Sequence, residues 1–217
     1  MNSLGEASVE MIKEIGNIGA GHIMMSISQT THVDTKIDIT RVYDLDGSQL
    51  SQIVPYLKDP VYALDFIFES SISGGFLLVF PKKLDEKVLI TLRSASASAL
   101  ANLVTSYARS MEDYIGIKCN ISLRKRYEDI ESVMLSEVFA PCLGTQKKML
   151  LIDTRYSVGS SFMTGHTFLY FNPENYENII KAALRQNTAF AGTDFQRSGF
   201  SLQFSPAEKL YNPTRRW

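Results

Sequence analysis

The chain has 217 residues, 45% of them hydrophobic and 21% charged, so it can bury a sizeable core without disulfide or metal staples. Its formal net charge of −1 gives no electrostatic case for a nucleic acid or an anionic membrane as partner. The two cysteines and three histidines show no metal-ligand spacing, and no apolar run is long enough to cross a membrane. We therefore expect a soluble, cytoplasmic protein with no metal site.

A long amphipathic helix is predicted over residues 8–31. At about 100° per residue, its apolar side chains fill one continuous sector. Glu14 and Asn17, which are three residues apart, are neighbours on the opposite, polar side. The apolar sector holds Met11, Ile12, Ile15, Gly19, Ile23 and Ile27, and the polar sector holds Glu10, Glu14, Asn17, Gly21, Met24 and Ser28.

Three glycines lie close together in this helix, although each weakens a helix by roughly 1 kcal/mol relative to alanine. Gly16 and Gly19 lie in or beside the apolar sector, which predicts that another element packs there at close range. Gly21 lies on the polar side, where the missing side chain leaves room for a partner to approach the backbone. His22 is expected at the edge of the buried sector, as a structural histidine.

The remaining elements follow from alternation and turn signals. Alternating residues predict a strand over 35–45, followed by a short helix over 48–57. A hairpin is predicted from strands over 61–69 and 76–80, and Pro81 opens a helix over 82–92. The second half repeats this order, with a helix over 94–115, a strand over 117–126, a helix over 128–138, a hairpin of 149–158 with 162–171, and a helix over 174–184.

The two halves also share sequence at a fixed offset of 92 residues, which indicates a duplicated unit. Pro81 aligns with Pro173, and Val88 aligns with Ile180. We therefore predict an α+β fold of two tandem αβ repeats, about 8–92 and 94–184, related by a pseudo-two-fold axis. Two long helices would pack on a six-stranded, largely antiparallel sheet. Residues 1–185 would form a single domain, and 186–217 a C-terminal tail that is either packed along the sheet edge or mobile.

The string EIGNIGAG, residues 14–21, resembles the signature helix of the CheC/CheX/FliY family of chemotaxis phosphatases, and of CheC above all. The family pattern has Asp or Ser, a Glu four residues later, an Asn three after that, and a Pro about 23 residues further on. This chain has Glu10, Glu14, Asn17 and Thr40 at those positions. The central pair matches and the outer two depart from the pattern. Thr40 is expected to leave the start of the following strand less rigidly turned than proline would. The order and lengths of the elements over roughly 8–185 also resemble the CheC fold.

CheC proteins often carry a second Glu/Asn pair on the equivalent helix of the second repeat. In this chain Asn102 stands at the second asparagine, and Tyr107 follows where relatives often have tyrosine. The place of the carboxylate, three residues before Asn102, holds Ala99. The second site is therefore predicted to be lost.

The resemblance implies an aspartyl-phosphate phosphatase that acts on a phosphorylated CheY-like response regulator. Asn17 would orient the attacking water, and Glu14 would dock against a lysine of the regulator, whose own Mg²⁺ serves the reaction. The protein would need no cofactor of its own. Gly21 and Met24 would form part of the docking surface.

A second hypothesis is a non-catalytic adaptor with the CheC fold that binds the deamidase CheD or a response regulator. Thr40 and the loss of the second site favour the adaptor. The intact pair of Glu14 and Asn17 favours catalysis, because phosphoryl transfer needs mainly positioning and charge stabilisation.

Overall fold

The structure is a computed structural model that describes residues 6–53, 62–69, 72–80, 86–127, 139, 148–159 and 164–190. The predicted helix over 128–138 and the opening of the predicted helix at Pro81 lie outside the described residues, as does the tail beyond residue 190. The predicted helix over 48–57 is described as far as residue 53.

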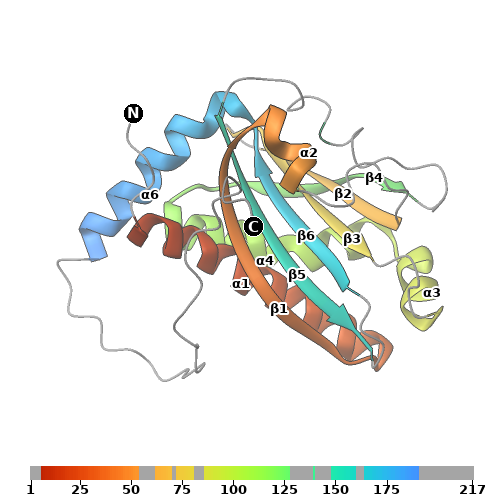
Figure 1. The fold of residues 1–217 in the computed structure, drawn as a ribbon. Helices are drawn as coiled ribbons and strands as arrows, with labels where there is room; N and C mark the ends of the chain where they lie inside the picture. Colours follow the sequence, from red (N-terminus) through yellow and green to blue (C-terminus); the bar gives the residue numbers. More distant parts are fainter. Residues whose placement is uncertain are drawn as a thin grey trace, which may run out of the picture.

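In both halves the described elements follow the predicted order (Figure 1). The helix α6 continues to Phe190 instead of ending near Leu184. The first half comprises α1 (Glu6–Thr31), β1 (Thr35–Asp46), η1 (Gly47–Gln49), α2 (Leu50–Ile53), β2 (Tyr62–Glu69), β3 (Gly74–Phe80) and α3 (Glu86–Ser94). The second half comprises α4 (Ala97–Ile115), β4 (Asn120–Tyr127), β5 (Lys148–Val158), β6 (Thr164–Phe171), η2 (Pro173–Asn175) and α6 (Tyr176–Phe190).

The six strands form one sheet in the order β1-β5-β6-β3-β2-β4, and every neighbouring pair is antiparallel. Exchanging β1 with β4, β2 with β5 and β3 with β6 gives the same order read from the other edge. The central pair, β6 and β3, comes from different repeats. This arrangement confirms the predicted α+β class and has the symmetry expected of a duplicated unit.

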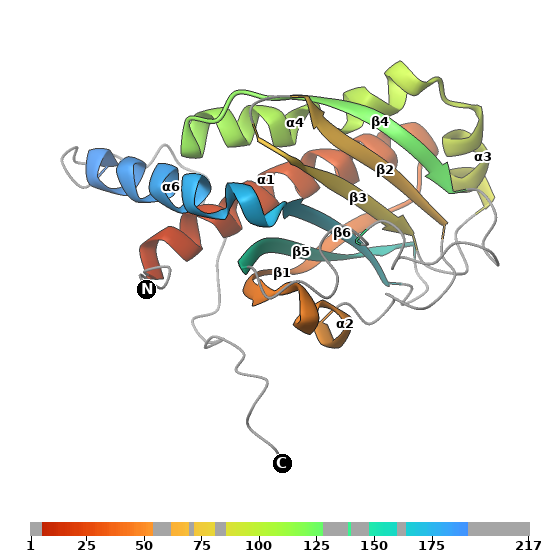
Figure 2. The same ribbon diagram turned by 90° about the horizontal axis from the view of Figure 1, so that it is seen from above.

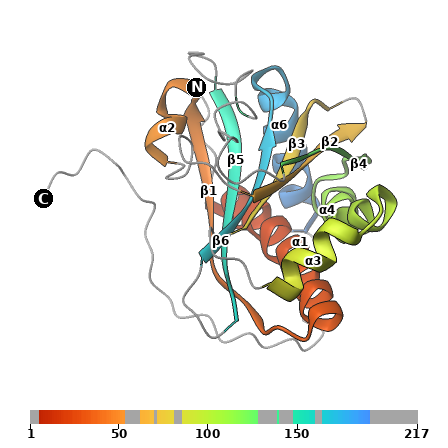
Figure 3. The same ribbon diagram turned by 90° about the vertical axis from the view of Figure 1, so that its right-hand side faces the viewer.

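Helices α1, α4 and α6 cover one face of the sheet, and α2 lies on the opposite side (Figures 2 and 3). The main core lies between that helical layer and the sheet. Among the described residues, no single helix is long and apolar enough to cross a membrane, although α3 and α4 together meet the length and composition test across a bend of 107°. The largest fully buried side chains of the main core include Ile12, Ile15 and Ile23 of α1, Tyr107 of α4, and Tyr62, Phe66, Phe76, Phe80 and Tyr156 of the sheet.

The glycines of α1 explain how closely this helix packs. A β-carbon at Gly16 would lie 2.7 Å from Ile152 Cγ2, and one at Gly19 would lie 2.5 Å from the ring of Tyr107. Both positions therefore have no room for a larger residue, as the sequence predicted. At Gly21 the nearest atom is Ile37 Cδ1 at 3.8 Å, which is an ordinary contact.

This difference predicts opposite effects of two matched substitutions. Gly19→Ala should lower the free energy of unfolding by about 1–3 kcal/mol, because the ring of Tyr107 would have to move. Gly21→Ala should raise it by about 0.5–1 kcal/mol, because alanine favours the helix and fits the space. Urea denaturation of the two variants measures both values, and equal effects would contradict the close packing at Gly19.

Candidate functional site

Glu14 and Asn17 lie side by side in the middle of α1, as their spacing predicted. Asn17 Nδ2 donates a hydrogen bond of 3.3 Å to Glu14 Oε2. Both residues are half-buried instead of fully exposed. Glu10, one turn earlier, is exposed and lies 3.8 Å from the ammonium group of Lys13. The amide and the carboxylate therefore remain accessible, and they are held together by one long hydrogen bond.

The accessible side of α1 continues beyond this pair, but with a different methionine from the predicted one. Met24 is 3% exposed and belongs to the core, whereas Met25 is 52% exposed. The prediction that Met24 forms part of a docking surface is therefore wrong. Thr35, at the start of β1, donates its hydroxyl hydrogen to the carbonyl oxygen of Met24 at 2.8 Å, so β1 covers that side of the helix.

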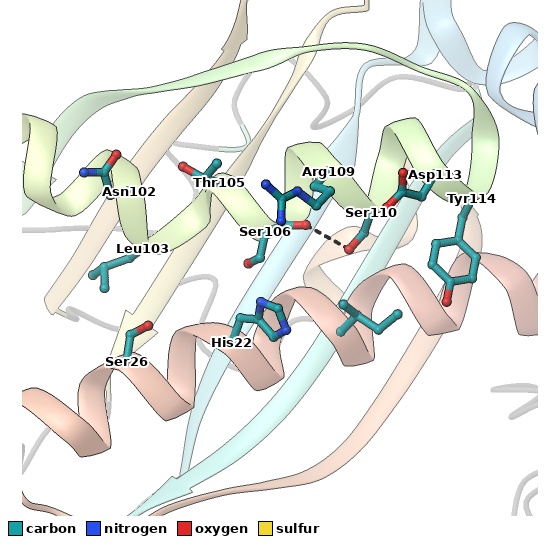
Figure 4. Close-up of a pocket in the computed structure, with 11 residues that line it drawn as sticks. His22, Ser26, Asn102, Leu103, Thr105, Ser106, Arg109, Ser110, Asp113 and Tyr114 are labelled. Carbon is teal, nitrogen blue, oxygen red and sulfur yellow. Dashed lines mark hydrogen bonds between the residues drawn. The ribbon is translucent and has the colours of Figure 1, made fainter. Parts of the chain in front are cut away.

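A groove of about 350 Å³ runs between α1 and α4 on the outer face of the helical layer. Figure 4 shows Ser26 and His22 of α1 across from Asn102, Ser106 and Arg109 of α4. His22 is exposed, so its expected place at the edge of the core is wrong.

Two serine hydroxyl groups of the groove donate to backbone carbonyl oxygens. Ser106 donates to the carbonyl oxygen of Gly19 at 3.3 Å, and Ser110 donates to the carbonyl oxygen of Ser106 at 2.8 Å (Figure 4). A serine nucleophile needs a neighbouring base that accepts its proton. Ser106 instead links α4 to α1, and Ser110 bonds within α4.

The C-terminal end of α4 brings a phenol close to Glu14. Tyr114 is half-buried at the end of the groove, and its ring reaches toward α1 (Figure 4). Partial burial raises the pKa of Tyr114, and the negative charges of Glu14 and Asp113 raise it further. The surface around Glu14 is therefore built by both repeats, which sequence spacing alone did not predict.

Thr40, which departs from the family pattern, lies in the interior of β1 and not at its start. It is 4% exposed, and its hydroxyl donates to Thr154 Oγ1 at 2.9 Å. A β-carbon at Gly16 would lie 2.9 Å from Thr40 Cγ2. Thr40 therefore forms part of the surface on which α1 rests directly below the candidate site.

The second repeat presents an asparagine without a carboxylate. Asn102 and Ala99 are both exposed on α4, and Asn102 lies at the end of the groove near Ser26, away from Tyr114 (Figure 4). This placement separates Asn102 from the Glu14 and Asn17 pair, and the loss of the second site stays a prediction.

Two buried polar arrangements were not predicted from the sequence. His166 Nδ1 lies 2.7 Å from Asp153 Oδ1 on neighbouring strands, and both side chains are buried. Tyr107 reaches the backbone of α1 with its hydroxyl group. The contact of His166 with Asp153 joins two strands, so it can be found in a sequence only once the strand register is known.

Within the described ranges there is no cluster of three or more His, Cys, Asp or Glu residues that could hold a metal ion.

The fold is similar to that of flagellar proteins of known structure. The crystal structure of Thermotoga maritima FliY matches with a TM-score of 0.58 and 17% identity, over 85% of this chain and 100% of that chain. FliM from the FliM–SpeE complex of H. pylori matches with a TM-score of 0.56 and 9% identity, over 85% and 98%. The middle domain of H. pylori FliM gives 0.54 and 9% identity, over 82% and 99%.

No model of a known protein family matches the sequence. The structural similarity confirms the fold that the resemblance to the CheC/CheX/FliY family predicted. At these identities it describes the fold alone, so a particular relation to CheC stays a prediction.

If Glu14 and Asn17 serve to recognise a partner, removing the side chain of Asn17 should lower the stability of the fold only slightly. Alanine favours a helix more than asparagine does, and the lost hydrogen bond is long and half-buried. We expect Asn17→Ala to change the free energy of unfolding by less than about 1 kcal/mol. Thermal or urea denaturation measures this change. A loss of more than about 2 kcal/mol would assign Asn17 to the structure and not to a site.

Proposed function

We propose that this protein is a phosphatase of a CheY-like response regulator in chemotaxis or flagellar signalling, with Asn17 and Glu14 of α1 as its site. The observation that carries the proposal is the accessible pair of an amide and a carboxylate, joined by a hydrogen bond of 3.3 Å. The fold likeness to FliY supports it, because the sequence string around this pair resembles the same family.

The chemistry of the pair fits a reaction whose reactive groups belong to the partner. Asn17 is neither a base nor a nucleophile, and Glu14 is the acidic group beside it. Hydrolysis of an aspartyl phosphate requires a water held in line with phosphorus and charge stabilisation around the phosphoryl group. The regulator would supply its own Mg²⁺ and lysine for the second requirement, and the phosphatase needs no cofactor of its own. A regulator of this kind would place the protein in the cytoplasm.

Docking would divide the roles of the two side chains. Glu14 would pair with the lysine of the regulator and fix the register of the two proteins. That ion pair releases the amide of Asn17 from Glu14, and the amide then orients the attacking water. The exposed Met25 and the open backbone at Gly21 lie further along the same side of α1 and would extend the contact.

The second candidate is a non-catalytic adaptor, which the likeness to FliM favours. A FliM chain that matches with a TM-score of 0.54 and 8% identity, over 82% of this chain and 99% of that chain, comes from a FliG–FliM complex of H. pylori. An adaptor of this fold would bind a regulator, CheD or a flagellar protein without changing the lifetime of the phosphate. The two candidates differ in what Asn17 does.

Substitutions at Asn17 and at Glu14 distinguish the orientation of the attacking water from the docking of the regulator. Asn17→Ala should reduce the acceleration of phosphate release by about 10²-fold, because its amide positions the nucleophile. Affinity for a regulator locked in its phosphorylated form by a phosphate mimic should stay within about twofold of wild type. Glu14→Ala should weaken that affinity roughly tenfold and lower the rate as well, because the ion pair with the regulator is lost.

Asn102→Ala is the matched control, since it removes an asparagine of the second repeat that has no carboxylate three residues before it. Its rate should equal that of wild type. Full activity of Asn17→Ala together with loss in Asn102→Ala would place the site on α4. A wild-type protein that binds a panel of regulators without accelerating phosphate release would support the adaptor.

A further inference from the structure

Tyr107 lies at the junction of α4, α1 and the sheet. Its side chain is 1% exposed, and its ring packs on Phe76 of β3 with centroids 4.5 Å apart. The same ring occupies the space where a β-carbon of Gly19 would lie. The phenol therefore reaches α1 through a contact that only glycine permits.

The hydroxyl group of Tyr107 is hydrogen-bonded on both sides. It donates to the carbonyl oxygen of Gly16 at 3.3 Å and lies 3.1 Å from Thr167 Oγ1 of β6. Because its one hydrogen points to Gly16, the hydroxyl of Thr167 is the donor in the second bond. Burial raises the pKa of Tyr107 well above its ordinary value, so the phenol keeps this hydrogen at any working pH.

The carbonyl group of Gly16 belongs to the peptide unit that also contains the nitrogen of Asn17. A side chain that holds this peptide unit fixes where the Asn17 side chain begins. We propose that Tyr107 is the positioning residue of the candidate site, tying the Gly16–Asn17 peptide to β6 so that the amide of Asn17 is held in register for its substrate. This inference deepens the proposed function and rests on it for its kinetic consequence.

A purely structural role for Tyr107 makes a different prediction, and the chain contains a control that separates the two. Tyr156 of β5 is also fully buried, and its hydroxyl donates to a backbone carbonyl, that of Val79, at 2.8 Å. Its bond joins two strands and does not involve α1. Tyr107→Phe and Tyr156→Phe therefore remove the same kind of bond and keep the same ring.

The kinetic test compares the two variants on a phosphorylated regulator. Tyr107→Phe should lower kcat by about tenfold while KM and the affinity for the locked regulator stay unchanged, because only the orientation of Asn17 is relaxed. Tyr156→Phe should leave kcat at the wild-type value, although both variants lose a buried hydrogen bond. Equal losses of kcat in the two variants would overturn the proposal, because they would reflect general loosening of the core.

A second readout does not depend on activity. The side-chain amide resonances of Asn17 in a ¹⁵N–¹H correlation spectrum, assigned with Asn17→Ala, should shift in Tyr107→Phe and not in Tyr156→Phe. Unchanged Asn17 resonances in Tyr107→Phe would overturn the positioning role even if the protein is a phosphatase. If wild type releases no phosphate, the proposed function fails and these resonances decide the positioning role alone.

If Tyr107→Phe does not fold, Thr167→Val provides the same comparison. It leaves Tyr107 in place and removes the hydroxyl that links it to β6. The Asn17 resonances should then shift in the same direction, with a smaller change than a direct break of the Gly16 contact would give. Resonances identical to those of wild type would again overturn the proposal.

Discussion

Helix α1 lies so close to its neighbours that two of its positions have no space for a β-carbon. Gly16 rests on Thr40 and on Ile152, and Gly19 rests on the ring of Tyr107. Each of these glycines weakens the isolated helix, and the close packing offsets that loss. With the buried side thus fixed, Glu14 and Asn17 are presented on the other side of a helix that cannot slide or rotate without a clash.

The two repeats share one architecture but differ in their buried charged pairs. Each hairpin carries one buried aspartate in its first strand, on the sheet face away from α1, α4 and α6: Asp65 in β2 and Asp153 in β5. Asp65 is paired with Arg124 of β4 at 2.6 Å, whereas Asp153 is paired with His166 of β6 at 2.7 Å. A buried carboxylate requires a partner, and the repeats have found different ones. The long helices differ as well, because α1 has Glu14 three residues before Asn17, whereas α4 has Ala99 three residues before Asn102.

Local patterns were enough to predict the described elements and the adjacency of Glu14 and Asn17, because helical and strand periods depend on neighbouring residues only. The apolar sector of α1 and the duplicated order of strands follow directly from those periods and from the offset between the halves. Met24 was misplaced because β1 passes beside α1 and covers it, and nothing within the helix specifies that passage. His22 was misplaced for the related reason that α4 forms a groove with α1 instead of closing over it. Tyr107 contacts Gly16 across 91 positions, and His166 contacts Asp153 on the neighbouring strand, so neither contact follows from a local period.

The bond between Asn17 and Glu14 bears on how a site without a nucleophile can be switched on by its substrate. A neutral-to-charged hydrogen bond of this length in a half-buried place contributes about 1 kcal/mol or less to stability. Under the proposed function, a lysine of the regulator would offer the carboxylate an ion pair that is partly desolvated on docking, and some close charge pairs of this kind contribute more than about 1.5 kcal/mol. The amide of Asn17 would then be released, under the same proposal, only where a matching cation arrives with the substrate. Because Tyr107 holds the Gly16–Asn17 peptide from below, the released amide would keep its position. Recognition and orientation would then be separate tasks of two residues one turn apart on the same rigid helix.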